Sequence, residues 1–104
     1  MFVEYVLFYA IKKALGLKDE EVKYSYSPFC LNAKVDGHSN CKQIVIYGDY
    51  KECDIFFENS VSDSTVTEIG KFGIINVMPI TKNEDRLEVT PVVTNGVKIH
   101  MSWR

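Results

Sequence analysis

The chain has 104 residues, of which 46% are hydrophobic and 25% charged, and its formal net charge is −2. This size and composition exclude a disordered chain and remove any need for disulfides or a structural metal, because packing alone can bury a core. The small negative charge excludes a general attraction to phosphate backbones. No repeat or linker interrupts the sequence, so we expect residues 1–104 to form one domain.

Residues 2–15 form the clearest predicted helix. Apolar side chains recur there at helical spacing and define the expected core stripe, namely Val3, Val6, Leu7, Ala10, Ile11 and Ala14. Gly16 follows and can adopt the left-handed conformation that ends a helix. Lys12 and Lys13 complement the helix dipole in the last turns.

The same segment is not expected to be a signal peptide or a membrane span. Glu4 stands where a signal peptide is basic, and no small-residue cleavage site follows. Lys12 and Lys13 interrupt the apolar run before it is long enough to cross a bilayer. We therefore expect a cytoplasmic protein without a membrane-embedded segment.

After residue 21 the pattern predicts mainly strands, separated by polar turns. The expected strands cover residues 22–27, 29–35, 43–47, 53–57 and 72–80. A capping box at Thr65 and Glu68 predicts a single helical turn between the last two of these strands. Pro91 is expected inside the penultimate strand of the chain, which would then lie at an edge or carry a bulge.

Asn95-Gly96 predicts a two-residue hairpin turn, because this dipeptide tolerates two positive φ angles. The implied register pairs Thr94 with Val97, Val92 with Ile99 and Thr90 with Met101. One face of this ribbon is apolar and is expected to be buried.

Three runs, at residues 44–47, 55–57 and 74–78, have apolar residues at successive positions, so both faces of these strands need cover. A helix of about 15 residues shields only part of one face. We therefore expect an α+β fold in which the N-terminal helix packs on a curved, mainly antiparallel sheet of five to seven strands that ends in the Asn-Gly hairpin. The other face is expected to fold onto itself as a sandwich or half-barrel, or to pack against another molecule.

A second face of the helix is the candidate partner-binding surface. Its residues are Phe2, Tyr5, Tyr9, Lys12 and Lys13. Aromatic side chains beside cations are typical of partner surfaces, because tyrosine combines a large contact area with a polar tip. The alternatives are that the helix lies in a groove of its own sheet with both faces internal, or that it lies on a membrane surface.

Cysteine and histidine suggest a second kind of site. Cys30, Cys41 and Cys53 are an odd number, which favours free thiols in a reducing compartment, although one disulfide plus a spare thiol is also consistent with it. His38 and Cys41 have the spacing of a zinc-ligand pair, but the other cysteines do not. The simpler interpretation is two strand thiols and a solvated histidine, and a Cys-His nucleophilic pair lacks an identifiable orienting group.

Other candidate chemistry is weaker. Asp49, Glu52 and Asp54 could bind a cation or act as acid and base, but a solvated hairpin tip explains them, and the common enzyme motifs are absent. Tyr24 and Tyr26, with Phe29 after the proline, could stack on nucleic acid. Lys23 and Lys34 are the only nearby cations and lie next to the acidic residues 19–21, so cross-strand packing of the tyrosines explains them better.

These observations predict a small non-catalytic interaction module, such as a regulator, inhibitor or assembly subunit, whose partner is a protein or a second copy of the chain. No catalytic residue, metal or cofactor is expected. The competing hypothesis is a protein that binds a small ligand or a metal, and that could be an enzyme, with a site near His38 and Cys41. Nucleic-acid binding is a third hypothesis.

Overall fold

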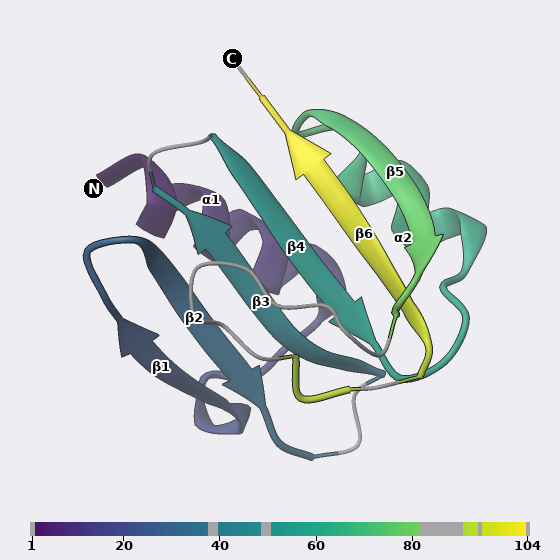
Figure 1. The fold of residues 1–104 in the computed structure, drawn as a ribbon, viewed down its shortest axis with the longest axis horizontal. Helices are drawn as coiled ribbons and strands as arrows, with labels where there is room; N and C mark the ends of the chain where they lie inside the picture. Colours follow the sequence, from purple (N-terminus) through teal and green to yellow (C-terminus); the bar gives the residue numbers. More distant parts are fainter. Residues whose placement is uncertain (1, 38–39, 49–50, 82–90, 94, 104) are drawn as a thin grey trace.

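The computed structural model describes residues 2–37, 40–48, 51–81, 91–93 and 95–103, with side chains described from residue 6 onward. This part of the chain forms an α+β fold with two α-helices and one open, antiparallel sheet of six strands (Figure 1). The helices are α1 (Phe2–Leu15) and α2 (Asp63–Ile69), and a 3-10 turn η1 covers Asp19–Glu21. The strands are β1 (Val22–Tyr26), β2 (Cys30–Val35), β3 (Cys41–Tyr47), β4 (Glu52–Phe57), β5 (Ile74–Pro79) and β6 (Val97–Ser102). Their spatial order is β1-β2-β3-β4-β6-β5.

The predicted N-terminal helix is confirmed over residues 2–15, and Gly16 follows it with a φ of +71°. Its buried stripe differs from the prediction, since Val6 is 70% exposed whereas Phe8 is only 3% exposed. Phe8 and Ile11 lie one turn apart and both belong to the main core. The larger apolar area of Phe8 outweighs that of Val6, so the helix presents this side chain inward.

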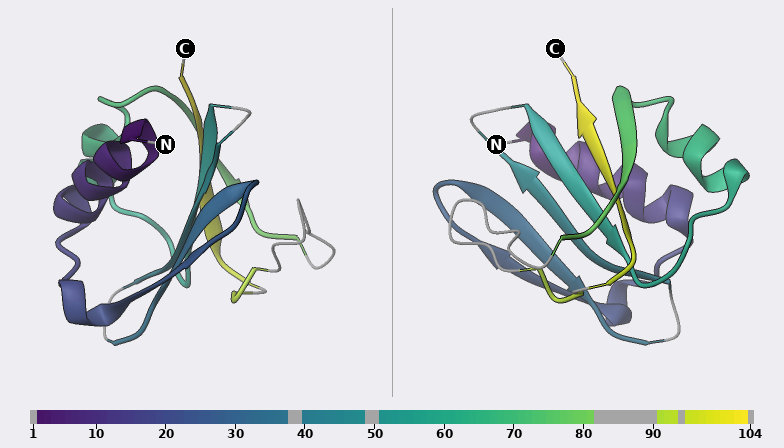
Figure 2. Two further views of the ribbon diagram at one scale, coloured as in Figure 1. Left: turned by 90° about the vertical axis from the view of Figure 1, so that its left-hand side faces the viewer. Right: turned by 45° about the vertical axis from the view of Figure 1, so that its right-hand side comes forward.

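Both helices lie on the same face of the sheet, which we call the helix face (Figure 2). The core under them takes large side chains from the three central strands, namely Ile44, Ile46, Ile55, Phe57, Ile99 and Met101. Leu7 and Leu15 of α1 and Val66 of α2 pack against this core from above. The two-sided burial predicted for β3 and β4 is confirmed, because their residues are buried on both faces.

The opposite face, which we call the open face, carries a second buried cluster made of Cys30, Val45, Tyr47, Phe56 and Ile80, with Val93 packed against it. Ile80 and Val93 come from the connection between β5 and β6. The fully buried Gln43 ties this connection to the sheet: its Nε2 donates to Asn32 Oδ1 and its Oε1 accepts from the Val92 backbone N–H, both at 3.0 Å. Within the described residues, the chain's own connection therefore covers part of the face that was expected to need a second sheet layer or another molecule.

The expected register of the Asn-Gly hairpin is wrong. β6 is paired on both sides, since Ile99 lies opposite Ile55 of β4 and opposite Val77 of β5, and no position remains for Val92. Val92 and Pro91 lie outside the strands, so Pro91 does not occupy an edge strand. Gly96 directly precedes β6 with a φ of +126°, whereas Thr94 and Thr90 lie outside the described residues. The apolar β5 replaces the sequence-adjacent segment as the partner of β6.

Two smaller expectations also change. The prediction that the run at residues 74–78 needs cover on both faces is wrong. This run forms β5, which is an edge strand with four of its six residues exposed. The short helix begins earlier than expected, because the side chain of Ser62, not Thr65, accepts the N-cap hydrogen bond, from the Thr65 backbone N–H. Beginning at Asp63 lets Ile69 reach the core as the buried residue of α2.

Candidate functional site

Among the described residues, exposed aromatic side chains stand on α1 and on the edge strand β1, two elements that meet where Phe8 packs on Tyr24. Val6 and Tyr9 of α1 are 70% and 63% exposed, and Tyr24 and Tyr26 of β1 are 51% and 44% exposed. We call these four residues the α1–β1 surface. Tyr24 and Tyr26 lie opposite Ala33 and Leu31 of β2, so alternation puts both tyrosines on the helix face.

Contacts beneath the surface join the helix to the strand. The ring of Phe8 packs edge-on against Tyr24 with 5.2 Å between the ring centres. The Lys12 ammonium lies 5.2 Å from the centre of the Tyr9 ring. Tyr9 and Tyr24 therefore each contact a buried side chain, which restricts their motion and lowers the entropy cost of ordering them on binding.

The predicted partner-binding residues have different surroundings. Tyr9 and Lys13 are exposed, whereas Lys12 is buried and forms an ion pair with Asp19. The pKa of Lys12 is raised, chiefly by its hydrogen bond to the Asp19 carboxylate, while burial acts in the opposite direction. The side chains of Phe2 and Tyr5 lie outside the described residues, although both positions belong to α1.

The sequence pattern does not connect the two halves of this surface. The alternation of residues 22–27 puts Tyr24 and Tyr26 on one face, but no local signal says that β1 is the strand beside α1. The register also separates Tyr24 and Tyr26 from Lys23 and Lys34, because these two lysines face each other across β1 and β2 on the open face. The aromatic platform and these two lysines therefore do not form one basic groove.

A chain of polar side chains on the open face was not predicted. Tyr47 Oη donates to Asp54 Oδ2 at 3.1 Å, and Asp54 Oδ1 lies 2.6 Å from His100 Nδ1. The other ring nitrogen, Nε2, lies 2.9 Å from Glu52 Oε1. Asp54 is only 3% exposed, so the expectation of a solvated hairpin tip is wrong for this residue. β4 begins at Glu52, and the ladder then places Asp54 beside His100 of β6.

The geometry of this network favours a structural role. Both ring nitrogens of His100 face carboxylates, one on each side of the ring. The carboxylates lie at opposite nitrogens, so Glu52 and Asp54 cannot converge with the ring on one ion. Among the described residues no group of three histidine, cysteine or acidic side chains could hold a metal.

The expected site near His38 and Cys41 is described only at Cys41. Cys41 is 2% exposed, and burial raises the pKa of its thiol to about 12. A thiol held neutral in the core is a poor metal ligand and a poor nucleophile. All three cysteines are free and buried, and His38 lies outside the described residues.

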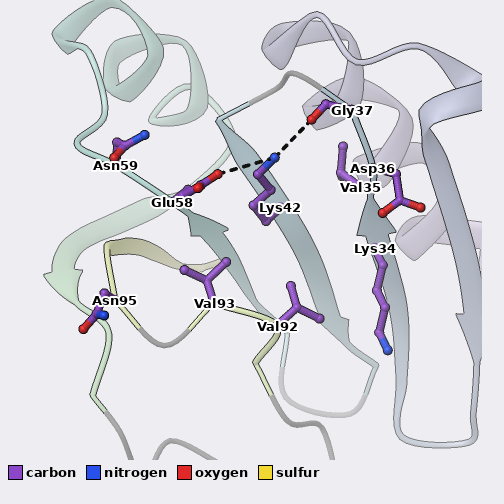
Figure 3. A pocket seen from close by; sticks show the side chains of 10 residues that line it. All are labelled: Lys34, Val35, Asp36, Gly37, Lys42, Glu58, Asn59, Val92, Val93 and Asn95. Carbon is purple, nitrogen blue, oxygen red and sulfur yellow. Dashed lines mark hydrogen bonds and ion pairs between the residues drawn. The ribbon is translucent and has the colours of Figure 1, made fainter.

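A groove of about 820 Å³ opens near the ends of β2 and β4, against Val92 and Val93 (Figure 3). Lys42 points across it, and its Nζ donates to the Gly37 carbonyl at 3.2 Å and lies 3.5 Å from a Glu58 carboxylate oxygen. The lining contains Lys34 and Lys42 and also Asp36 and Glu58, so its charges balance. The groove therefore does not select an anionic or a cationic ligand.

No family model, curated protein or solved structure matches this chain. Neither helix in the described part of the chain has the length and apolar character needed to cross a bilayer.

Proposed function

We propose that this protein is a small non-catalytic interaction module that binds a partner protein through the α1–β1 surface. The observation that carries the proposal is the exposure of three tyrosines and Val6 on two elements that contact each other through Phe8 and Tyr24. Tyrosine is enriched in protein interfaces and dominates their binding energy more often than most residues.

The anchoring of the surface supports the same function. Phe8 fixes Tyr24 from below, and the buried Lys12 packs beside the Tyr9 ring. Side chains that are already ordered lose little entropy on binding, so contact area converts into affinity more efficiently. The lack of charge selection at the groove gives no comparable support to a small-ligand function.

We place the module in the reducing cytoplasm. The support is that Cys30, Cys41 and Cys53 are all free thiols within the core. Free buried thiols are the usual state of cysteine in that compartment, whereas secreted small domains use cysteine for disulfides.

The test begins with photo-crosslinking from the surface itself. Tyr9 and Tyr26 are replaced, one at a time, by a photoreactive phenylalanine analogue, and irradiation takes place in extract of the cells that make the protein. A third variant carries the same group at Val92, which is 47% exposed but lies on the open face. We expect one crosslinked protein from both tyrosine positions and none of it from the Val92 position.

The purified crosslinked protein is then titrated with alanine variants. We expect Tyr9→Ala and Tyr26→Ala each to raise its Kd by about tenfold or more, the effect of removing an interface anchor. Val92→Ala is the matched control and leaves the Kd unchanged. Crosslinking with equal yield from all three positions would refute the proposal. A Kd that neither Tyr9→Ala nor Tyr26→Ala changes would refute it as well.

A further inference from the structure

The edge strand β5 combines exposure with a complete lack of charge. Residues 72–81 contain no acidic or basic side chain, and within β5 Ile74 and Val77 are 68% and 49% exposed. The opposite edge is different, because β1 contains Lys23 and directly follows the acidic turn Asp19–Glu21. Proteins commonly protect edge strands with charge, and an uncharged apolar edge is available for pairing with another strand.

The ladder shows which backbone groups of β5 face outward. The Ile80 N–H donates to the Gly96 carbonyl at 3.1 Å, one position beyond the pairing of Pro79 with Val97. In an antiparallel ladder such hydrogen-bonded positions alternate, so Met78, Asn76 and Ile74 bond to β6. The N–H and C=O groups of Ile75 and Val77 therefore point away from β6, and the described sheet has no further strand on that side.

We propose that two copies of this chain associate by pairing β5 with β5 in antiparallel orientation about a two-fold axis at Asn76. In this register Ile75 of each copy lies opposite Val77 of the other, and the outward backbone groups of these residues bond reciprocally. Ile74, which is 68% exposed, lies opposite Met78 of the second copy.

Two features commit the occupant to a second copy. The outward row of donors and acceptors requires a β-strand, and β5 supplies the same row to itself, as an isologous contact must. Because β5 has no charged side chain, no two like charges face each other across the two-fold axis. A register centred on Val77 would instead place Ile75 opposite Pro79, which has no N–H to donate.

This association goes beyond the proposed partner-binding function and uses the opposite edge of the sheet. The first test is sedimentation velocity of wild type, Asn76→Lys and Asn76→Glu. We expect the wild type to dimerise and each variant alone to have a Kd of self-association at least about tenfold higher, because like charges then meet at the axis. Mixing the two variants restores the dimer, because opposite charges face each other.

A matched control is Ser25→Lys, which places the same charge on the exposed edge strand β1. It leaves the dimer intact, as does Tyr9→Ala, so failure of this inference is separable from failure of the partner-binding proposal. A wild type that stays monomeric, or a dimer abolished by Ser25→Lys and not by Asn76→Lys, would overturn β5 pairing.

Disulfide trapping checks the register. Asn76 of the two copies forms a non-hydrogen-bonded pair with Cα atoms about 4.5 Å apart, within the range a disulfide spans. Oxidised Asn76→Cys is therefore expected to run as a covalent dimer on a non-reducing gel. Ile74→Cys, whose counterpart in the second copy is Met78, stays monomeric, and the native cysteines are buried and do not interfere. Crosslinking of Ile74→Cys in place of Asn76→Cys would exclude the register.

Discussion

Glu52 and Asp54 contact the same imidazole from opposite sides, but their side chains are 24% and 4% exposed. We expect Asp54→Ala to lower the free energy of unfolding by about 3 kcal/mol, since it removes the buried carboxylate that accepts from the Tyr47 hydroxyl and faces one nitrogen of His100. Glu52→Ala, where water replaces the lost partner, is expected to cost about 1 kcal/mol or less. Urea denaturation measures both values, and equal losses would contradict the difference in burial.

The buried thiols predict how stability changes in alkali. The Cys41 thiol ionises near pH 9 in the unfolded chain but stays protonated to about pH 12 in the folded protein, because burial disfavours the thiolate. The buried neutral thiol therefore makes its full contribution to the free energy of unfolding below pH 9. Above that pH the free energy of unfolding falls by about 1.4 kcal/mol per pH unit. Cys41→Ala should show a shallower fall of unfolding free energy between about pH 9 and about pH 11 in urea titrations. Parallel pH profiles for variant and wild type would contradict this linkage.

Two glycines with positive φ give a matched comparison. At Gly96, with φ +126°, a Cβ would collide with the Phe57 carbonyl oxygen and with the Glu58 backbone, whereas at Gly16, with φ +71°, it would meet nothing within 4 Å. We expect Gly16→Ala to cost about 1 kcal/mol from backbone strain alone, and Gly96→Ala to cost about 3 kcal/mol or more. Thermal unfolding compares the two, and similar midpoints would refute the clash at Gly96.

At the scale of elements, α2 is short enough for its cap to determine its stability. The Ser62 hydroxyl accepts from the Thr65 backbone N–H at 3.3 Å, and the Thr65 side chain is not the cap. Ser62→Ala is therefore expected to destabilise the protein by about 1 kcal/mol, whereas Thr65→Ala is nearly neutral because alanine also favours the helix. The denaturation midpoints of the two variants in guanidinium chloride distinguish the two caps. A larger loss of stability in Thr65→Ala than in Ser62→Ala would favour Thr65, the cap predicted from the sequence.

The elements differ in how well local pattern predicts them. Residues 2–15 are predicted because one helical period and Gly16 act within a single segment. The partner of β6 is not predictable in this way, because Asn95-Gly96 favours a turn but carries no information about which strand lies alongside. The apolar β5 pairs with β6, although 17 residues separate Pro79 from Val97. Long-range strand choice depends on competing burial that a local turn signal does not encode.

The candidate site shows the same limit. Tyr9 follows from helical spacing, and Tyr24 and Tyr26 follow from strand alternation, but their meeting depends on β1 lying beside α1. The sequence pattern predicts a solvent-exposed Asp54, because Asp49 and Glu52 flank the turn before it. Its actual partners are Tyr47 and His100, and His100 is 46 residues away in sequence. A sequence pattern places a residue on a face but does not identify what the fold brings against it.

At the scale of the whole molecule, the Gln43 side chain joins the open face by hydrogen bonds to the connection that covers it. The Val92 N–H donates to Gln43 Oε1, and Gln43 Nε2 donates in turn to Asn32. Gln43→Ala should therefore destabilise the protein by about 1–3 kcal/mol and leave the Val92 amide without its acceptor. We expect the Val92 amide to exchange with solvent deuterium faster, while the Ile99 amide within the sheet stays protected. Unchanged exchange at Val92 would show that other contacts hold this segment.

The position of β6 between β4 and β5 also has a consequence for synthesis. A ribosome that adds roughly 5–20 residues per second completes β5 about one to five seconds before it completes β6. During that interval β5 has no strand beside it, because its neighbour in the finished sheet is β6 alone. The uncharged strand that we infer joins two finished copies thus gains its one partner within the sheet only after residues 97–102 have been made.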